Sequence, residues 1–474
     1  MTDLSSLSAL EIAALVRTRQ VSAVEVTEAA LRRADALGET VGAFTVVAHD
    51  LALAQASTLD DRLADGDGLD LPLVGVPCPI KDLNPVAGLP WESGSAALRG
   101  VVADVDDGIV EWLRDAGTVM LGKTTAPEFG FPCYTEPDGL PPARTPWDLS
   151  RSAGGSSGGA AAAVAAGIVP LAQGSDGGGS IRIPASACGL VGLKPSRGRV
   201  PSGPLREPGP GLATSGVLSR TVADTAAALD VLARPRLGET YYAPAPATSF
   251  LAATSLRPSG LRVGVLTTPV IAEAEVHPEA LAAVDKAVSL LEALGHHVEA
   301  APIPFTVDRW DAFMALWTFG ATMIPLPPEA EPLLTPMTRW LRAEGRGVTA
   351  TEFATALMDL QRLTREVALA WSRFDLVLTP TLAQPPALVG GLRNDADPAA
   401  DFAAQMRFTP WTSVYNLSGL PALSLPLHAA EVEGRRLPFG IMLGGGFGAE
   451  GVLLSVGAQL EEAVGGWEPA PALS

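Results

Sequence analysis

The chain has 474 residues, of which 47% are hydrophobic and 18% charged, proportions that suit a globular protein with a large interior. Its formal net charge of −19 would repel phosphate backbones and favours solubility, so a nucleic-acid partner is not expected. The most apolar run, residues 160–169, is too short to span a bilayer, and residues 1–4 have neither the basic nor the apolar segment of a signal peptide. We therefore expect a cytoplasmic protein without a membrane partner.

In the first half of the chain, residue patterns predict elements in this order: two helices within residues 5–38, a buried strand at 73–76, a helix at 109–116, a short strand at 119–121 and an alanine-rich helix at 160–166. The second helix should begin with a capping box between Ser22 and Glu25. The strand at 73–76 would lead to Lys81.

The second half predicts further elements: a long surface connection rich in proline and alanine at 235–260, a strand at 261–266, a helix at 279–294, a strand at 376–380, and strands at 422–425 and 439–443 that should pair. Helices that alternate with apolar strands indicate an α/β fold, an α/β/α sandwich with a central mixed β-sheet flanked by helices. The sequence shows no internal repeat, and we expect one domain over residues 1–474, with N-terminal helices in 1–60.

The cysteines and histidines form no metal motif. Three cysteines are odd in number and lack CxxC spacing, which favours free thiols in a reducing compartment: Cys78, Cys133 and Cys188. The five histidines build neither HExxH nor a Cys/His cluster. We expect no metal and no other cofactor.

Residues 117–124 match the P-loop pattern GxxxxGK[ST] letter for letter. A phosphate loop needs a strand before its first glycine and a free backbone loop after it. Here a helix should precede Gly117, and strand-like residues occupy the loop positions. A nucleotide site is therefore disfavoured.

Residues 154–158 and 155–159 both match the GxSxG pattern of a nucleophile elbow. That motif should follow a buried strand and have Asp and His partners downstream. The preceding residues, 147–152, are polar, and the histidines at 277, 296 and 297 are expected on surface elements. An α/β-hydrolase site is disfavoured as well.

Lys81 follows an apolar run and is a candidate base. Serine becomes a nucleophile only when a base takes its proton. A lysine can act as that base only when it is neutral, and burial in an apolar site lowers its pKa toward that state. The alternative is a lysine that pairs with Asp82 or another acid at the end of a strand.

Two glycine-rich segments carry the candidate serines. The glycines around Ser156 and Ser157 permit unusual backbone geometry, although a loop that only caps the following helix would look the same. Residues 177–180 place backbone N–H groups in a row without side chains, as an oxyanion hole requires. The alternative for this second segment is a tight turn before a strand at Ile181.

Together these motifs resemble the amidase signature family, serine hydrolases with a Ser–cis-Ser–Lys triad. Five further segments resemble motifs of that family and extend the likeness over most of the chain: residues 121–130, 180–185, 192–199, 219–224 and 415–422. The resemblance implies the amidase signature fold, with its core in residues 65–235. The family usually has Thr at the position of Gly177, so the precision of this loop is in question.

The resemblance also implies residue roles. Ser180 would attack the carbonyl, Ser156 would relay the proton, and Lys81 would be the final base. The backbone N–H groups of Gly177, Gly178, Gly179 and Ser180 would form the oxyanion hole. Ser157, Asp176 and Arg182 would support the site.

Within the family, the chain is most similar to the 6-aminohexanoate-cyclic-dimer hydrolase subgroup, which implies small uncharged amides as substrates, and carbamates (urethanes) by the same acyl chemistry. Residues 305–345 are rich in aromatic residues and should form the pocket rim. Candidate pocket residues are Cys133, Trp310, Met314, Trp317 and Asn416. The alternative is the A subunit of a tRNA-dependent glutamine amidotransferase, which would need partner subunits; otherwise a monomer or homodimer is expected.

Overall fold

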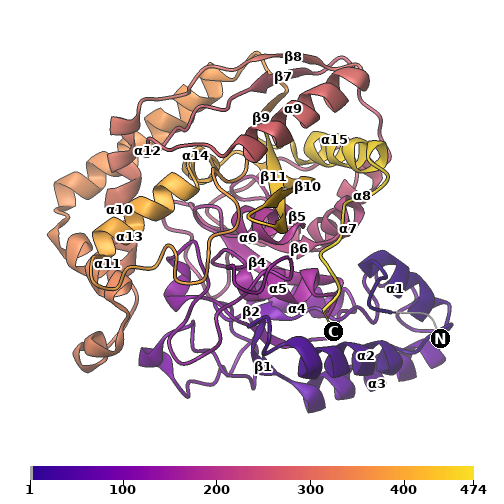
Figure 1. Cartoon of the computed structure of the whole chain (residues 1–474). Helices are drawn as coiled ribbons and strands as arrows, with labels where there is room; N and C mark the ends of the chain where they lie inside the picture. The colour runs from indigo at the N-terminus through magenta and orange to yellow at the C-terminus, as the bar shows by residue number, and fades with distance from the viewer. Residues whose placement is uncertain (1–3, 474) are drawn as a thin grey trace.

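The computed structural model describes residues 4–473, with a large mixed β-sheet at its centre (Figure 1). Within these residues, eight strands lie in the order β4-β6-β5-β10-β11-β9-β7-β8. Neighbours are antiparallel from β4 to β9 and parallel from β9 to β8, which confirms the expected α/β architecture. The strands are β4 (Leu171–Asp176), β5 (Val191–Lys194), β6 (Thr214–Ser219), β7 (Arg262–Val265), β8 (His297–Ala300), β9 (Leu376–Pro380), β10 (Ala422–Val432) and β11 (Arg435–Gly445).

Helices cover both faces of this sheet. The ring of Phe439 in β11 stacks on His277, which caps α9, whereas a side chain at the next residue, Gly440, would meet Ser186 of α6. Successive strand residues face opposite sides, so α9 and α6 lie on opposite faces. Helices of this central region are α5 (Gly158–Ala165), α6 (Arg182–Cys188), α7 (Val222–Leu232), α8 (Phe250–Ala253), α9 (Pro278–Ala293), α14 (Thr412–Ser418) and α15 (Glu450–Ala463).

A second, small sheet has the order β1-β3-β2 and lies near the N-terminal helices (Figure 1). Strands β2 and β3 are parallel, and β2 ends at Lys81. The elements of this region are α1 (Ala9–Arg17), α2 (Ala23–Leu37), β1 (Phe44–Val47), α3 (His49–Ala64), β2 (Ile80–Lys81), η1 (Ala96–Leu98), α4 (Gly108–Asp115), β3 (Gly122–Thr124) and η2 (Glu128–Gly130). The predicted capping box of Ser22 and Glu25 is confirmed at the start of α2.

The predicted rim region is a helical layer at one side of the molecule (Figure 1). Helix α10 packs on both α11 and α12, and α11 packs on α13. The elements of this layer are η3 (Val307–Trp310), α10 (Asp311–Thr322), η4 (Pro328–Leu333), α11 (Pro336–Gly347), α12 (Ala350–Ala370) and α13 (Pro398–Phe408).

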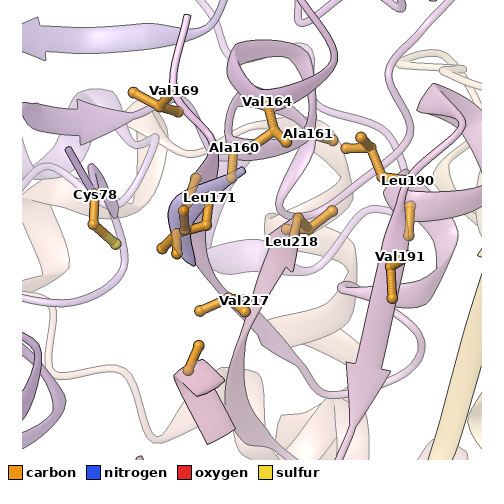
Figure 2. Close-up of a cluster of buried hydrophobic side chains, with 14 of the residues drawn as sticks. Cys78, Ala160, Ala161, Val164, Val169, Leu171, Leu190, Val191, Val217 and Leu218 are labelled. Atoms are coloured by element: carbon orange, nitrogen blue, oxygen red, sulfur yellow. The ribbon is translucent and has the colours of Figure 1, made fainter. Parts of the chain in front are cut away.

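The core beneath the glycine- and serine-rich segments is built from alanine, valine and leucine side chains. Figure 2 shows Ala160, Ala161 and Val164 of α5 near Leu171 of β4 and Leu218 of β6. All of them are buried. Alanine lets a helix approach a sheet closely, and this packing fixes the start of α5 beside β4.

Two strand predictions were wrong in position. Residues 73–76 form a turn rather than a strand, because Gly75 adopts a φ of +73°, although Leu73, Val74 and Val76 are buried as expected. The strand predicted at 119–121 begins at Gly122, after a turn at Gly117 with φ +87°. The connection at 235–260 contains the short helix α8.

The remaining elements follow the sequence pattern closely. The strand at 376–380 has the predicted limits, and β10 pairs with β11 as expected, although both strands are longer than predicted. Residues 1–3, part of the predicted N-terminal region, lie outside the described residues. Among the helices formed by residues 4–473, none combines the length and hydropathy of a bilayer-crossing segment.

Candidate active site

Lys81 lies fully buried at the end of β2 and faces two hydroxyls. Its Nζ donates hydrogen bonds to Ser156 Oγ at 2.8 Å and to Ser175 Oγ at 3.1 Å. Burial lowers the pKa of the amine well below its ordinary 10.5; the nearby Asp176 acts in the opposite direction, and the Arg206 charge adds to the lowering. Burial therefore favours the neutral form of an amine that lies in contact with the Ser156 hydroxyl.

Lys81 makes no ion pair with Asp82. Asp82 instead binds Lys123, with 2.7 Å between Oδ1 and Nζ, and both side chains are buried. Lys123 belongs to the P-loop pattern, which here forms strand β3 and is not a phosphate loop. The alternative interpretation of Lys81, a lysine paired with its neighbouring acid, is wrong.

The segment of Ser156 and Ser157 lies directly before α5. The Gly155–Ser156 peptide bond is cis. Ser157 Oγ donates to the Ser175 carbonyl at 3.2 Å, and the Ser157 N–H donates to the Ser180 carbonyl at 3.3 Å. Ser157 thus connects the segment of Ser156 to strand β4 and to Ser180.

The backbone of residues 176–180 is held by its carbonyl oxygens. The Asp176 carbonyl accepts from Asn416 Nδ2, the Gly178 carbonyl from the Thr412 and Ser413 hydroxyls, and the Gly179 carbonyl from Ile183 N–H. In a trans peptide, the N–H of the next residue points in the direction opposite to the carbonyl oxygen. The N–H groups of Gly177, Gly178 and Ser180 have no acceptor among residues 4–473.

Gly179 differs from its neighbours. Its N–H donates to Asp176 Oδ1 at 2.8 Å, so it is not available to an oxyanion, which corrects the expectation for this residue. Its φ is +134°, and a Cβ there would lie 2.6 Å from both Ile183 Cδ1 and Thr412 Oγ1. Gly179 therefore shapes the loop instead of serving as a donor. Residue Ser180 leads into helix α6, not into the strand that the alternative placed at Ile181.

Asp176 is the centre of a buried polar network beneath this loop. Its carboxylate accepts from Arg182 Nε and Nη2, both at 2.9 Å, from Asn416 Nδ2 at 2.9 Å, and from Ile181 N–H at 3.1 Å. Burial would raise the pKa of Asp176, but the Arg182 guanidinium outweighs it and holds the pKa below its ordinary value. The network keeps a carboxylate and a guanidinium charged in the interior.

Two predicted pocket residues, Asn416 and Met314, line neither of the two cavities at Ser180. Asn416 is buried and bonds Asp176 and Arg182, so it supports the loop from behind. Met314 packs within the hydrophobic layer of α10. For these two cavities the prediction is wrong at both residues, because the sequence does not reveal which side chains of a segment face a cavity.

Two cavities meet at Ser180. The smaller one, about 50 Å³, is mainly apolar, and its lining includes Cys133, Trp310 and Trp317, as predicted. The larger one, about 330 Å³, also reaches Ser156 and Ser175. Ser180, Phe131 and Trp317 line both cavities.

Several contributing residues were not singled out from the sequence. Ser175 contacts the Lys81 amine, and Thr412 and Ser413 hold the Gly178 carbonyl. Ser175 lies in the glycine-rich run, so its position was a usable signal. Thr412 and Ser413 come from a helix more than two hundred residues away, and no local pattern points to them.

The site contains a nucleophile candidate beside a buried amine and a polar loop, and no histidine among residues 4–473 lines either cavity. Ser180 Oγ has no hydrogen-bond partner within the described part of the chain. Those same residues include no group of three or more side chains arranged to hold a metal ion.

Comparison with known proteins gives consistent matches along the whole chain. The family model described as "Amidase" matches residues 25–454. A 6-aminohexanoate-cyclic-dimer hydrolase from Paenarthrobacter ureafaciens is 34% identical, over 95% of this chain and 94% of the relative. A solved structure of 6-aminohexanoate cyclic dimer hydrolase matches with a TM-score of 0.89 and 32% identity, covering 98% of each chain. A bacterial aryl acylamidase of the amidase signature family matches with a TM-score of 0.84 and 28% identity, over 98% of this chain and 97% of that one.

Proposed function

Because the chain belongs to the amidase signature family and is a hydrolase of amide bonds, we propose that it cleaves amide and carbamate bonds of small apolar or aryl substrates through an acyl-enzyme. The observation that carries the proposal is the 2.8 Å hydrogen bond between the fully buried Lys81 amine and Ser156 Oγ. A lysine in that setting has the lowered pKa that a base requires.

In the proposed reaction, Ser180 Oγ attacks the substrate carbonyl while its proton passes to Ser156, whose own proton passes to the Lys81 amine. The backbone N–H groups of Gly177, Gly178 and Ser180 stabilise the oxyanion; each such donor is worth about 10²–10³ in rate. Lys81 then returns the proton through Ser156 to the leaving nitrogen, the C–N bond breaks, and an ester to Ser180 remains. Water then attacks this ester while its proton passes through Ser156 to Lys81, and the proton returns through Ser156 to Ser180 Oγ as the acid leaves.

The apolar lining of the smaller cavity supports apolar and aryl substrates. The rings of Trp310 and Phe313 stack at 4.2 Å, and those of Phe313 and Trp317 at 5.3 Å. Flat apolar groups pack well against such rings. A carbamate presents the same carbonyl and leaving amine to Ser180, so the same steps apply to it.

The test is hydrolysis of a matched aryl amide and aryl carbamate by the purified chain, with Ser180→Ala as the blank. We expect Ser180-dependent turnover of both compounds, and losses of several orders of magnitude in Lys81→Ala and Ser156→Ala. Near wild-type rates in Lys81→Ala would refute the triad. Turnover of the amide alone would exclude carbamates as substrates.

The same experiment addresses the partner requirement. We propose that the chain acts as a monomer or homodimer, in the cytoplasm and without other subunits. Ser180-dependent activity that appears only after addition of partner subunits would instead support the A subunit of an amidotransferase.

A further inference from the structure

One stretch of chain, residues 128–134, lines both cavities of the site, and we call it the wall segment. Phe129 and Gly130 line the larger cavity, Pro132 and Cys133 line the smaller one, and Phe131 lines both. The segment therefore passes from one cavity to the other, and its position sets the width of each.

The backbone of the wall segment has a shape that its own residues do not favour. Phe129 has a φ of +49° and a ψ of 13°, in the left-handed region that bulky side chains avoid. Such a conformation persists only where the surrounding contacts hold it. At the next residue, Gly130, a Cβ would lie 3.1 Å from Ser156 Oγ. The strained turn thus lies directly beside the serine that relays the proton in the proposed reaction.

A buried carboxylate holds the first end of the wall segment. Glu128 Oε1 accepts a hydrogen bond from Ser95 Oγ at 2.6 Å, and Oε2 accepts from the N–H and the hydroxyl of Thr335 at 2.8 Å and 2.6 Å. The Phe129 N–H donates to the Ser93 carbonyl at 2.8 Å. Because Thr335 is the N-cap of α11, this first anchor ties the strained turn to the helical layer.

A second buried carboxylate holds the other end. Asp401 Oδ2 accepts from the Tyr134 hydroxyl at 2.7 Å, and Oδ1 accepts from Gln405 Nε2 at 2.7 Å. Gln405 Oε1 accepts in turn from the Cys133 N–H at 2.7 Å. Asp401 and Gln405 both belong to α13, so this second anchor also reaches the helical layer. A Cβ on Gly155 would lie 2.7 Å from the Tyr134 backbone, so this end is packed tightly as well.

The carboxylates of the two anchors lie away from the substrate. Glu128 and Asp401 are each 2% exposed, and neither lines either cavity. Their effect on catalysis must therefore pass through the wall segment. A displacement of about 1 Å in a positioning contact can cost about a hundredfold in rate.

On the basis of the proposed function, we propose that Glu128 and Asp401 are positioning residues that set the size of the substrate. The first anchor fixes Phe129 and with it the larger cavity, and the second fixes Cys133 and with it the smaller one. Because the cavities meet at Ser180, a bound amide extends its acyl half into one and its amine half into the other. Each anchor therefore governs one half of the substrate.

Two variants that each delete a single hydroxyl loosen one anchor apiece. Ser95→Ala removes a donor from Glu128. Tyr134→Phe removes a donor from Asp401. Each leaves a buried carboxylate oxygen with fewer hydrogen bonds, and neither Ser95 nor Tyr134 lines a cavity. The matched control, Ser455→Ala, removes a buried hydroxyl of α15.

The test uses two series of aryl amides that share acetanilide. In the first series the acyl group lengthens from acetyl to hexanoyl, and in the second the aniline carries a para-alkyl group from methyl to butyl. Release of the aniline is followed by chromatography, and the kcat/KM of each compound is divided by that of acetanilide. This ratio cancels any change in the folded fraction or in the Lys81 pKa.

The wild type should show a steep fall in the ratio at some length in each series, because one methylene is worth about 10–200-fold in a fitted pocket. Ser95→Ala should reduce that fall by about tenfold, the lower end of this range, in one series and leave the other unchanged. Tyr134→Phe should do the same in the opposite series. Ser455→Ala should reproduce both wild-type profiles.

The outcomes separate the two proposals. Ser180-dependent hydrolysis with both wild-type profiles retained in Ser95→Ala and Tyr134→Phe would overturn this inference and leave the proposed function intact. So would an effect of both variants on the same series, an equal effect of Ser455→Ala, or a wild type without a steep fall in either series. Release of aniline no faster in the wild type than in Ser180→Ala, for every compound, would refute the proposed function and this inference with it.

Discussion

Replacing Asp176 with Asn tests whether the buried network beneath the glycine-rich loop holds the site together. The carboxylate accepts five hydrogen bonds, three at Oδ1 and two at Oδ2. An Asn side chain must place its NH₂ at one of these positions, so at least two donors lose their acceptor and face another donor. If the NH₂ takes the position of Oδ2, the donors that lose their acceptor are Ile181 N–H and Arg182 Nε.

The variant also leaves Arg182 as a buried charge without its counter-charge. Removal of one partner from a buried ion pair costs about 3–5 kcal/mol, and we expect that loss in the free energy of unfolding of Asp176→Asn. The Gly179 N–H would lose or weaken its anchor as well. Hence kcat should fall together with stability.

The sign of the pH dependence follows from the lowered pKa of Asp176. A carboxyl group whose pKa is lower in the folded state stabilises the fold above its unfolded pKa and loses that contribution as pH falls. The wild-type advantage over Asp176→Asn should therefore be full near neutral pH and shrink only in acid.

Urea unfolding, monitored by fluorescence and by residual activity, measures the difference. The matched control is Glu28→Gln, which breaks an exposed i,i+4 pair with Arg32 and should change stability very little. A decrease of less than about 1 kcal/mol in the free energy of unfolding of Asp176→Asn, with normal kcat, would refute the account of the network. Breaking a buried ion pair should cost more than that.

Three further predictions concern the site itself. Gly179→Ala places a Cβ 2.6 Å from Thr412 Oγ1 at a φ of +134° and should reduce kcat at least about a hundredfold. In Gly178→Ala the nearest contact is 3.3 Å, so kcat should fall much less. Equal losses of kcat in the two variants would contradict the argument. Activity should rise with pH as Lys81 loses its proton, with a midpoint well below 10.5 because burial lowers its pKa. Arg206→Leu removes a nearby positive charge and should move this midpoint upward. A downward shift would refute the assignment of the midpoint to Lys81. Trp317→Ala removes a wall shared by both cavities and should widen the range of substrates accepted in an N-acyl series, whereas an unchanged range would show that Trp317 does not limit substrate size.

Much of this protein follows from local residue patterns. Residue patterns gave the mixed α/β architecture, because the alternation of apolar strands with helices is local information. They also singled out Lys81, Ser156 and Ser180, since glycine-rich segments and a lysine after an apolar run are visible in one dimension. In the structure both serines line the larger cavity, and the Lys81 amine bonds Ser156 behind it. Two strands were misplaced because Gly75 and Gly117 turn the backbone with positive φ. The apolar residues beside these glycines look like strand residues, so the sequence did not reveal the turns.

The tertiary structure sets the environment of these residues. It paired Asp82 with Lys123 and left Lys81 to Ser156, and it placed Asn416 behind the loop rather than in a cavity. Such partners come from segments separated by tens to hundreds of residues, and their contacts depend on which face each helix buries. The charge state of Lys81, the free N–H groups of the loop and the division into two cavities are properties of packing and desolvation, which exist only once the chain has folded.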